Sequence, residues 1–188
     1  MKSKNTFTIL PFLFIFFTCI SYSQMGEGHK FCDELKDGKY FPLSYEFKKK
    51  ILWSKSFYWE TREGTKVING KTYVEIKQEW EDKSIVLLYC REENGVVYQY
   101  DEELKRDDIR FDENFKENKN WKLADGKTTY KIISYNGVLR TPYCEYKNLL
   151  VIDAVMNYGH FNFYYLKGHG YIGATKDGHL ISCLTPEW

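Results

Sequence analysis

Apolar and polar residues alternate along most of the chain after about residue 50. In the segment 71–80, Val74, Ile76 and Trp80 share one face with Thr72 and Gln78, and the other face carries Tyr73 and charged residues. A period of two is typical of strands that bury one face and expose the other. The abundance of β-branched residues and the 18% aromatic content also suit half-buried pleated surfaces.

Six turn dipeptides separate the alternating segments. Asn-Gly and Asp-Gly both tolerate positive φ at two successive positions, as a type I′ hairpin turn requires. They occur at Asn69-Gly70, Asn94-Gly95, Asn136-Gly137, Asp37-Gly38, Asp125-Gly126 and Asp177-Gly178. Short turns of this kind predict antiparallel neighbours, because a parallel crossover takes a dozen or more residues.

The pattern predicts an all-β fold, an antiparallel meander of hairpins with one short N-terminal helix at residues 28–37. So many strands cannot stay flat, so the meander should curl into a half-barrel or barrel or split into a sandwich. Residues 102–120 are too charged for a core strand and should hold the longest loops. The expected strands lie near residues 50–61, 66–69, 71–80, 84–92, 95–101, 120–124, 128–135, 138–146, 148–157, 161–167, 170–175 and 179–184.

The N-terminus has the pattern of a signal peptide over residues 1–23. Lys2 and Lys4 precede an apolar run from residue 9 to residue 20, which is shorter than the roughly 20 residues that span a bilayer. The small residues Ser21 and Ser23 stand at the positions that signal peptidase recognises and predict cleavage before Gln24. A lipid anchor at Cys19 is not expected, because Phe-Phe-Thr precedes it where a lipobox has aliphatic and small residues. The mature chain, residues 24–188, should form a single all-β domain in the periplasm, at the cell surface or outside the cell, and it has no later segment apolar enough to span a membrane.

The charge and the cysteine content of the mature chain restrict its possible partners and indicate its disulfides. Cleavage removes two of the 27 Lys and Arg residues and none of the 26 acids, which leaves a net charge near −1 and argues against nucleic acid. Four cysteines remain, an even number that predicts two disulfides in an oxidising compartment. Four cysteines allow three pairings. Because domain termini are often close together, we expect Cys32–Cys183, and because Cys90 and Cys144 each end one arm of an Asn-Gly hairpin, we expect these hairpins to meet side by side and form Cys90–Cys144; four buried free thiols are the alternative.

Aromatic residues exceed what simple core filling requires. Some strands carry them on both faces, which is typical of a strand that is central in a sandwich or that lines a cavity while its back is covered. Such a sheet could hold an acyl chain, a sugar or a peptide strand on its concave side, although core filling and β propensity explain the same residues. The candidate ligand-facing aromatics are Trp53, Phe57, Trp59, Trp80, Phe161, Phe163 and Tyr165.

Three segments resemble pieces of small secreted all-β proteins of Gram-negative bacteria, which are mostly of unknown activity. They are VINGKTY at 67–73, YCREENGVVYQY at 89–100 and YYLKGHGYIG at 164–173. The resemblance covers about residues 50–184 and is similar in outline to the half-barrels of periplasmic lipoprotein carriers. It implies a curved meander and an exported location. His169 stands where such proteins often have an apolar residue.

Catalytic motifs are absent from the sequence: it has no Gly-x-Ser-x-Gly elbow, His-Glu-x-x-His or phosphate-binding glycine loop. His160, His169 and His179 could converge on a metal, but their spacing is that of solvent-facing turn residues. The acidic residues of 101–113 lack the spacing of a calcium loop, and the interleaved Lys105, Arg106 and Arg110 suggest a solvated, self-compensating loop. No cofactor is expected.

Two functions fit these patterns. The first is an exported, non-catalytic domain that binds a lipid, a carbohydrate or an envelope protein, or is itself an envelope component. The second is a secreted glycosidase-like hydrolase whose carboxylates assemble only in the fold. Two acids about 5–9.5 Å apart in a cleft would favour the hydrolase, and a deep apolar cavity would favour the binding protein.

Overall fold

A computed structural model describes residues 31–34, 38–44, 48–156 and 158–187. The expected signal peptide, its cleavage site and Cys19 lie outside the described residues, as does most of the expected helix at 28–37. Residues 31–34 form a turn, and no helix occurs in the part of the chain that the structure describes, so the N-terminal helix is not confirmed. Within that part, no helix is long and apolar enough to cross a membrane.

Twelve antiparallel strands form one sheet, as the alternating pattern predicted. Their order in the sheet is β6-β5-β4-β3-β2-β1-β12-β11-β10-β9-β8-β7, so the chain runs as a meander in which the first and last strands pair. The strands are β1 (Lys49–Trp53), β2 (Ser56–Ile68), β3 (Lys71–Trp80), β4 (Ile85–Glu93), β5 (Val96–Asp101), β6 (Arg106–Asp112), β7 (Asn120–Lys122), β8 (Thr129–Arg140), β9 (Glu145–Met156), β10 (Gly159–Leu166), β11 (Gly170–Lys176) and β12 (His179–Leu184).

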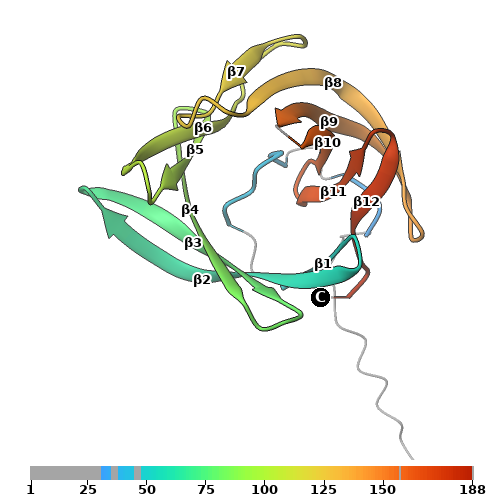
Figure 1. Ribbon diagram of the computed structural model, residues 1–188, viewed down its shortest axis with the longest axis horizontal. Helices are drawn as coiled ribbons and strands as arrows, with labels where there is room; N and C mark the ends of the chain where they lie inside the picture. The colour runs from blue at the N-terminus through green and yellow to red at the C-terminus, as the bar shows by residue number, and fades with distance from the viewer. Residues whose placement is uncertain (1–30, 35–37, 45–47, 157, 188) are drawn as a thin grey trace, which may run out of the picture.

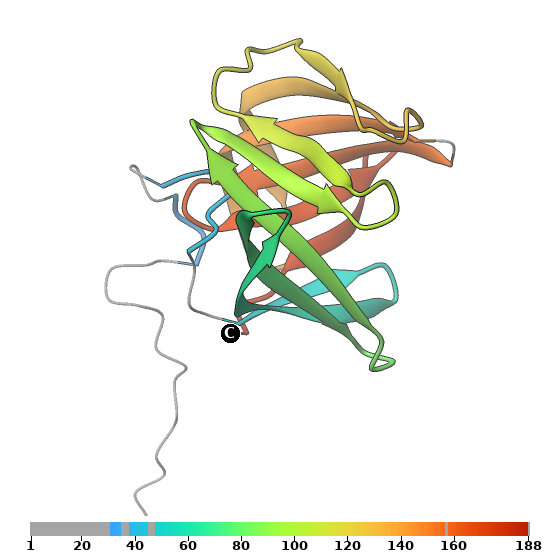
Figure 2. The same cartoon turned by 90° about the vertical axis from the view of Figure 1, so that its left-hand side faces the viewer.

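The sheet rolls into a ring that brings its two edge strands, β6 and β7, beside each other (Figures 1 and 2). These strands do not pair in a backbone ladder. Side chains link them instead: Trp121 Nε1 donates to the Ile109 carbonyl at 3.1 Å, and Asp108 Oδ1 accepts from the Ala124 amide at 2.8 Å. Arg106 Nη2 also donates to the Ala124 carbonyl at 2.6 Å. The ring is therefore open in its strand pairing and closed by side chains.

Three of the turn dipeptides form the hairpin turns that they predicted. Both residues have positive φ at Asn69-Gly70, Asn94-Gly95 and Asp177-Gly178, which connect β2 to β3, β4 to β5 and β11 to β12. Asn136-Gly137 does not, and the hairpin expected there is wrong, because β8 continues through it. A β-carbon on Gly137 would lie 2.2 Å from Val151 Cγ2, so this glycine permits close packing against β9.

Two other boundaries differ from the prediction. The segment 50–61 is divided by a turn at Ser54, whose φ is 57°, and β2 then runs on to Ile68. The charged region 102–120 contains strand β6 rather than only loops. An edge strand pairs on one side only, and a half-exposed edge tolerates charges that a central strand would not.

The buried apolar side chains of the rolled sheet form two large clusters. One surrounds Ile51, Tyr146 and Leu184, and the other surrounds Ile132 and Ile152. Every one of these five side chains is at most 2% exposed.

The segment 38–44 lies within one end of the ring rather than in the sheet (Figure 1). Phe41 stacks on Tyr165 at 4.3 Å and on Phe111 at 5.1 Å between ring centroids. Lys39 forms an ion pair with Glu92 of β4, and its carbonyl accepts from the Gly168 amide at 2.8 Å. The segment therefore contacts both sides of the ring.

A disulfide joins Cys32 to Cys144, in the connection between β8 and β9. The expected pairing of Cys32 with Cys183 and of Cys90 with Cys144 is wrong, and Cys90 and Cys183 are buried free thiols. Strands β3, β2, β1, β12, β11 and β10 separate β4 from β9, so Cys90 and Cys144 cannot meet side by side as adjacent hairpins would allow.

Reduction of the Cys32–Cys144 bond should destabilise the protein substantially. The bond spans a sequence separation of 112 residues, and on the chain-entropy model a loop of that size restricts the unfolded chain by about 4–5 kcal/mol. We expect reductant to lower the melting temperature by about 10 °C and to have no effect on a C32S/C144S variant. Peptide mapping without reduction should recover a Cys32–Cys144 peptide; a disulfide peptide containing Cys90 or Cys183 would contradict the structure.

Candidate functional site

A cavity of about 460 Å³ lies inside the rolled sheet. Most of its walls are aromatic or aliphatic side chains from the strands, and the segment 38–44 contributes to one wall. The lining residues are Phe41, Pro42, Leu43, Lys49, Trp53, Tyr58, Glu60, Ile76, Gln78, Trp80, Leu88, Cys90, Val97, Gln99, Arg110, Tyr130, Ile152, Phe163, Tyr165, Gly170 and Tyr171.

Strand alternation explains which side chains face this cavity. Ile76, Gln78 and Trp80 of β3 line it, and they belong to the face that the sequence pattern grouped together. On β4, Leu88 lines the cavity, whereas the preceding Leu87 is 39% exposed on the opposite face. The cavity wall is thus the apolar face of the meander, turned inward when the sheet rolls.

Four of the seven aromatic residues singled out in the sequence line the cavity: Trp53, Trp80, Phe163 and Tyr165. Phe161 is buried outside the lining and packs against the Tyr158 ring at 5.5 Å between centroids. Phe57 and Trp59 are not in the lining either. Lysine ammonium groups lie over both rings, at 4.8 Å from the Phe57 centroid and 4.3 Å from the Trp59 centroid.

The face of β2 was hard to assign because both of its faces carry aromatic residues. The structure turns Tyr58 and Glu60 inward, and Tyr58 packs on Trp80 with 4.8 Å between ring centroids. Aromatic residues at 57, 58 and 59 carry no apolar-polar contrast. Glu60, the carboxylate that follows these aromatic residues, is only 7% exposed and lies on the buried face.

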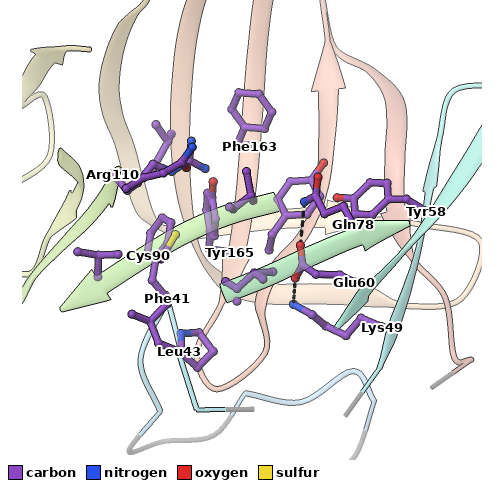
Figure 3. A pocket seen from close by; sticks show the side chains of 18 of the residues that line it. Phe41, Leu43, Lys49, Tyr58, Glu60, Gln78, Cys90, Arg110, Phe163 and Tyr165 are labelled. Carbon is purple, nitrogen blue, oxygen red and sulfur yellow. Dashed lines mark hydrogen bonds and ion pairs between the residues drawn. The ribbon is translucent and has the colours of Figure 1, made fainter. Parts of the chain in front are cut away.

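A compensated ion pair occupies one side of the cavity (Figure 3). Lys49 Nζ lies 2.9 Å from Glu60 Oε1, and the two residues are 1% and 7% exposed. Lys49 also donates to the His169 carbonyl at 3.2 Å, and Gln78 Nε2 donates to Glu60 Oε2 at 2.9 Å. Because both charges have close partners, this group satisfies itself without a ligand.

Arg110 extends into the opposite side of the cavity in Figure 3. The sequence suggested that it belonged to a solvated loop, and that interpretation is wrong. Val97 pairs with Phe111 and Tyr98 pairs with Ile109, so Arg110 is the extra residue of a β-bulge. A bulge re-aims side chains, and here it lets Arg110 and the buried Phe111 both face the interior. In the described part of the chain, Arg110 forms no ion pair with a carboxylate.

The groups around Arg110 are neutral. Burial raises the pKa of Tyr165 to about 12 even though Arg110 lowers it, and burial likewise raises the pKa of Tyr130. Tyr165, Tyr130 and Arg110 all line the same cavity. Burial also raises the pKa of Cys90 to about 11, so this thiol stays protonated. A protonated thiol is a poor nucleophile.

The three histidines considered for a metal are not brought together. His160 and His169 lie at opposite ends of β10, and His179 begins β12. His169 is 1% exposed and its Nε2 lies 3.0 Å from the Asp33 carbonyl oxygen, so the expectation of a solvent-facing turn residue is wrong for this histidine. Within the described residues, no group of three or more His, Cys, Asp or Glu side chains could hold a metal ion.

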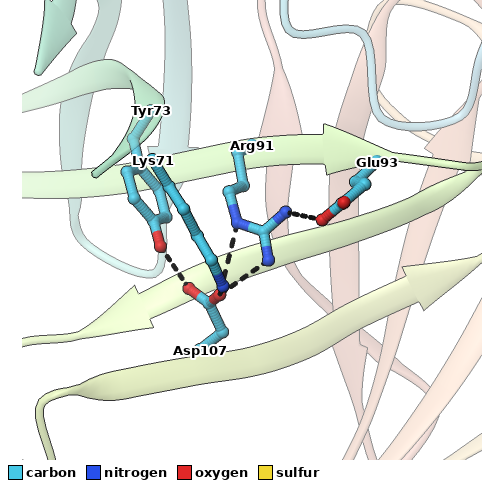
Figure 4. A network of polar contacts seen from close by, with 5 residues as sticks. All are labelled: Lys71, Tyr73, Arg91, Glu93 and Asp107. Carbon is cyan, nitrogen blue, oxygen red and sulfur yellow. Dashed lines mark hydrogen bonds and ion pairs between the residues drawn. The ribbon is translucent and has the colours of Figure 1, made fainter. Parts of the chain in front are cut away.

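The acidic region 101–113 contributes to a polar network on the outer face of β3, β4 and β6 (Figure 4). Asp107 accepts hydrogen bonds from Lys71 Nζ at 3.0 Å, Tyr73 Oη at 2.6 Å and Arg91 Nη2 at 2.7 Å. Arg91, 9% exposed, also donates to Glu93. These donors occupy the Asp107 carboxylate, and the network holds the edge strand β6 to β3 and β4.

Replacing Asp107 with Asn should destabilise the protein in a pH-dependent way. Burial raises the pKa of Asp107, but the hydrogen bonds from Tyr73, Arg91 and Lys71 lower it more, so it lies below the usual 3.8. The stabilisation is therefore complete above pH 3.8 and is lost as pH falls through the lower folded value. At pH 7 we expect D107N to lose about 2–3 kcal/mol, because Arg91 keeps its charge without its main partner.

Urea unfolding at several pH values measures this effect. The difference between wild type and D107N should shrink as pH falls below 3.8. E145Q is the control, because it removes a carboxylate from the exposed pair Arg140–Glu145 and should leave the midpoint nearly unchanged. A D107N midpoint equal to that of E145Q would contradict the structural role of the network.

Comparison with known proteins adds a single likeness of fold. No family model matches the chain, and no curated protein matches it. Among solved structures it is similar to a Bacteroides fragilis protein described as exported and as having a YmcC-like fold. The two chains are 6% identical over 79% of this chain and 97% of the other, with a TM-score of 0.49. Nothing about function follows from a likeness at this level.

Proposed function

We propose that this chain is an exported, non-catalytic protein that binds a small apolar or amphipathic molecule inside its rolled sheet. The cavity carries the proposal. Its volume of about 460 Å³ falls within the roughly 300–1,000 Å³ of small-molecule sites. Aromatic walls such as Tyr58, Trp80 and Phe163 offer a ligand apolar surface that is already ordered, so binding costs little further ordering.

The polar lining favours binding over hydrolysis. Glu60 is the one carboxylate among the described residues that line the cavity, and it is ion-paired to Lys49. A glycosidase requires a second carboxylate about 5–9.5 Å away. No histidine occurs in this lining, and the thiol of Cys90 is protonated. No observation on the cavity therefore favours the hydrolase.

Export is supported by two independent features. Residues 1–23 have the pattern of a signal peptide, with Gln24 as the first mature residue and residues 24–188 as one domain. The Cys32–Cys144 disulfide is typical of proteins that fold outside the cytosol. An interior cavity favours a small molecule, such as a lipid, over an envelope protein as the occupant.

Blocking the cavity should abolish ligand binding. The test uses the neutral dye N-phenyl-1-naphthylamine, whose fluorescence increases in apolar surroundings. In L88W the larger ring would occupy the cavity, and we expect dye affinity to fall at least about tenfold, because burial of the dye's apolar surface is lost.

L87W is the matched control, because residue 87 is the neighbour of Leu88 on the same strand and is exposed on the other face. Its dye affinity should equal that of wild type. Circular dichroism establishes that both variants fold. Equal dye binding by folded L88W and L87W, or no binding by wild type, would refute the proposal.

The mature N-terminus tests export. Intact mass spectrometry of the secreted or periplasmic protein should give a chain that begins at Gln24, with or without cyclisation to pyroglutamate. A chain that retains residues 1–23, or one that begins with an acylated Cys19, would contradict the predicted processing.

A further inference from the structure

The cavity contains more positive than negative charge. Among the lining residues the structure describes, Lys49 and Arg110 are cationic and Glu60 is the one anion. Lys49 and Glu60 neutralise each other at 2.9 Å. The guanidinium of Arg110 is therefore the charge inside the cavity that lacks a carboxylate among the described residues.

Arg110 is partly exposed, and its guanidinium lies in a mainly apolar cavity, so part of its hydration is lost and no negative charge in the described part of the chain compensates for that loss. Arginine keeps its proton in proteins, so it cannot relieve the cost by becoming neutral, as a buried lysine can. The neighbouring Tyr165 hydroxyl supplies a dipole but no counter-charge. An anion bound at Arg110 would remove most of this cost, because charge-assisted hydrogen bonds are stronger in a low dielectric.

The backbone also favours a ligand-directed role for Arg110. In a regular strand, Arg110 would point away from the interior that its neighbour Phe111 occupies. The bulge at Val97 and Tyr98 interrupts that alternation and turns the guanidinium inward. Bulges are over-represented next to binding and active sites because they re-aim a side chain in this way.

We infer that the cavity ligand is an anionic amphiphile, whose carboxylate or phosphate oxygens bind Arg110 and whose apolar body lies along the aromatic wall. This inference rests on the proposed function and specifies the ligand class. The fork of the guanidinium matches two oxygens of either group. Tyr165 and Tyr130, kept neutral by burial, can donate hydroxyl hydrogens to the same anion.

The apolar body would extend from Arg110 across the cavity. In Figure 3, Tyr165 and Phe163 lie between Arg110 and the Lys49–Glu60–Gln78 group on the opposite side. Because the Lys49–Glu60 pair is already compensated, it offers no second site for an anion. The ligand accordingly needs one anionic end, and a neutral or cationic analogue of the same length should bind less well.

Displacement of N-phenyl-1-naphthylamine by three matched twelve-carbon compounds tests the inference. Dodecanoate and dodecyl phosphate carry an anionic group and are used below their critical micelle concentrations, and dodecanol is the neutral analogue and is used below its solubility limit. We expect wild type to bind at least one of the two anions roughly tenfold or more tightly than dodecanol, the gain expected from hydrogen bonds to a charged group. The anion with the higher affinity identifies carboxylate or phosphate as the ligand group.

Two substitutions at Arg110 test whether the anionic group of the ligand binds this side chain. R110Q removes the charge and should reduce anion affinity at least about tenfold while dodecanol affinity stays within about twofold. R110K keeps the charge without the planar fork and should retain part of the preference for the anion. R140Q is the matched control, since it removes an exposed arginine on the outer surface and should change none of the three affinities.

The outcomes separate this inference from the proposed function. Equal affinity of wild type for dodecanol and both anions would overturn the anionic amphiphile but leave the cavity as a binding site. An unchanged anion preference in R110Q would also overturn the inference. Failure of the dye and all three compounds to bind would refute the binding function and the inference together. If R110Q does not fold, the comparison of anions with dodecanol in wild type, and R110K, still decide the question.

Discussion

The closure between β6 and β7 is the constraint on which the cavity depends. A twelve-stranded sheet with two free edges encloses a space only if those edges stay together, and here hydrogen bonds from Trp121 and Ala124 to β6 hold them. The strand that carries Arg110 is therefore paired with β5 on one side and joined to β7 by side chains on the other. If β6 separated from β7, the cavity would lose its cationic wall.

The ring is braced at two further places. Inside, Phe41 stacks between Tyr165 of β10 and Phe111 of β6, and the Cys32–Cys144 bond ties the chain just before this segment to the connection between β8 and β9. Outside, Asp107 joins β6 to β3 and β4 through Lys71, Tyr73 and Arg91. Both braces act on β6, an edge strand whose backbone pairs only with β5. These side-chain contacts add to the single ladder that β6 forms with β5.

Local patterns in the sequence predicted most of the sheet but little of the site. Alternation and Asn-Gly turns located β3, β4 and β5 because a strand's period and a type I′ turn are set by nearby residues. The Cys32–Cys144 pairing depends on how the ring closes, which no local pattern records. Arg110 was missed because its neighbours are charged and because a bulge, which depends on the register of β5 against β6, reverses its direction. Glu60 was visible only as a carboxylate on a strand whose two faces look alike in composition.

The two cationic side chains of the cavity differ in whether a carboxylate neutralises them, and this difference limits which ligands the cavity can bind. Lys49 is held by Glu60 and by the His169 carbonyl, so its charge contributes to the structure and is not available to a ligand. Arg110 has no such carboxylate within the described chain, and its protonation cannot respond to burial. If core packing were its only role, an apolar residue at this bulge would avoid the cost of desolvating the guanidinium. An anionic ligand supplies the missing negative charge, whereas a neutral competitor leaves the guanidinium uncompensated. The cavity therefore discriminates between ligands by charge as well as by shape.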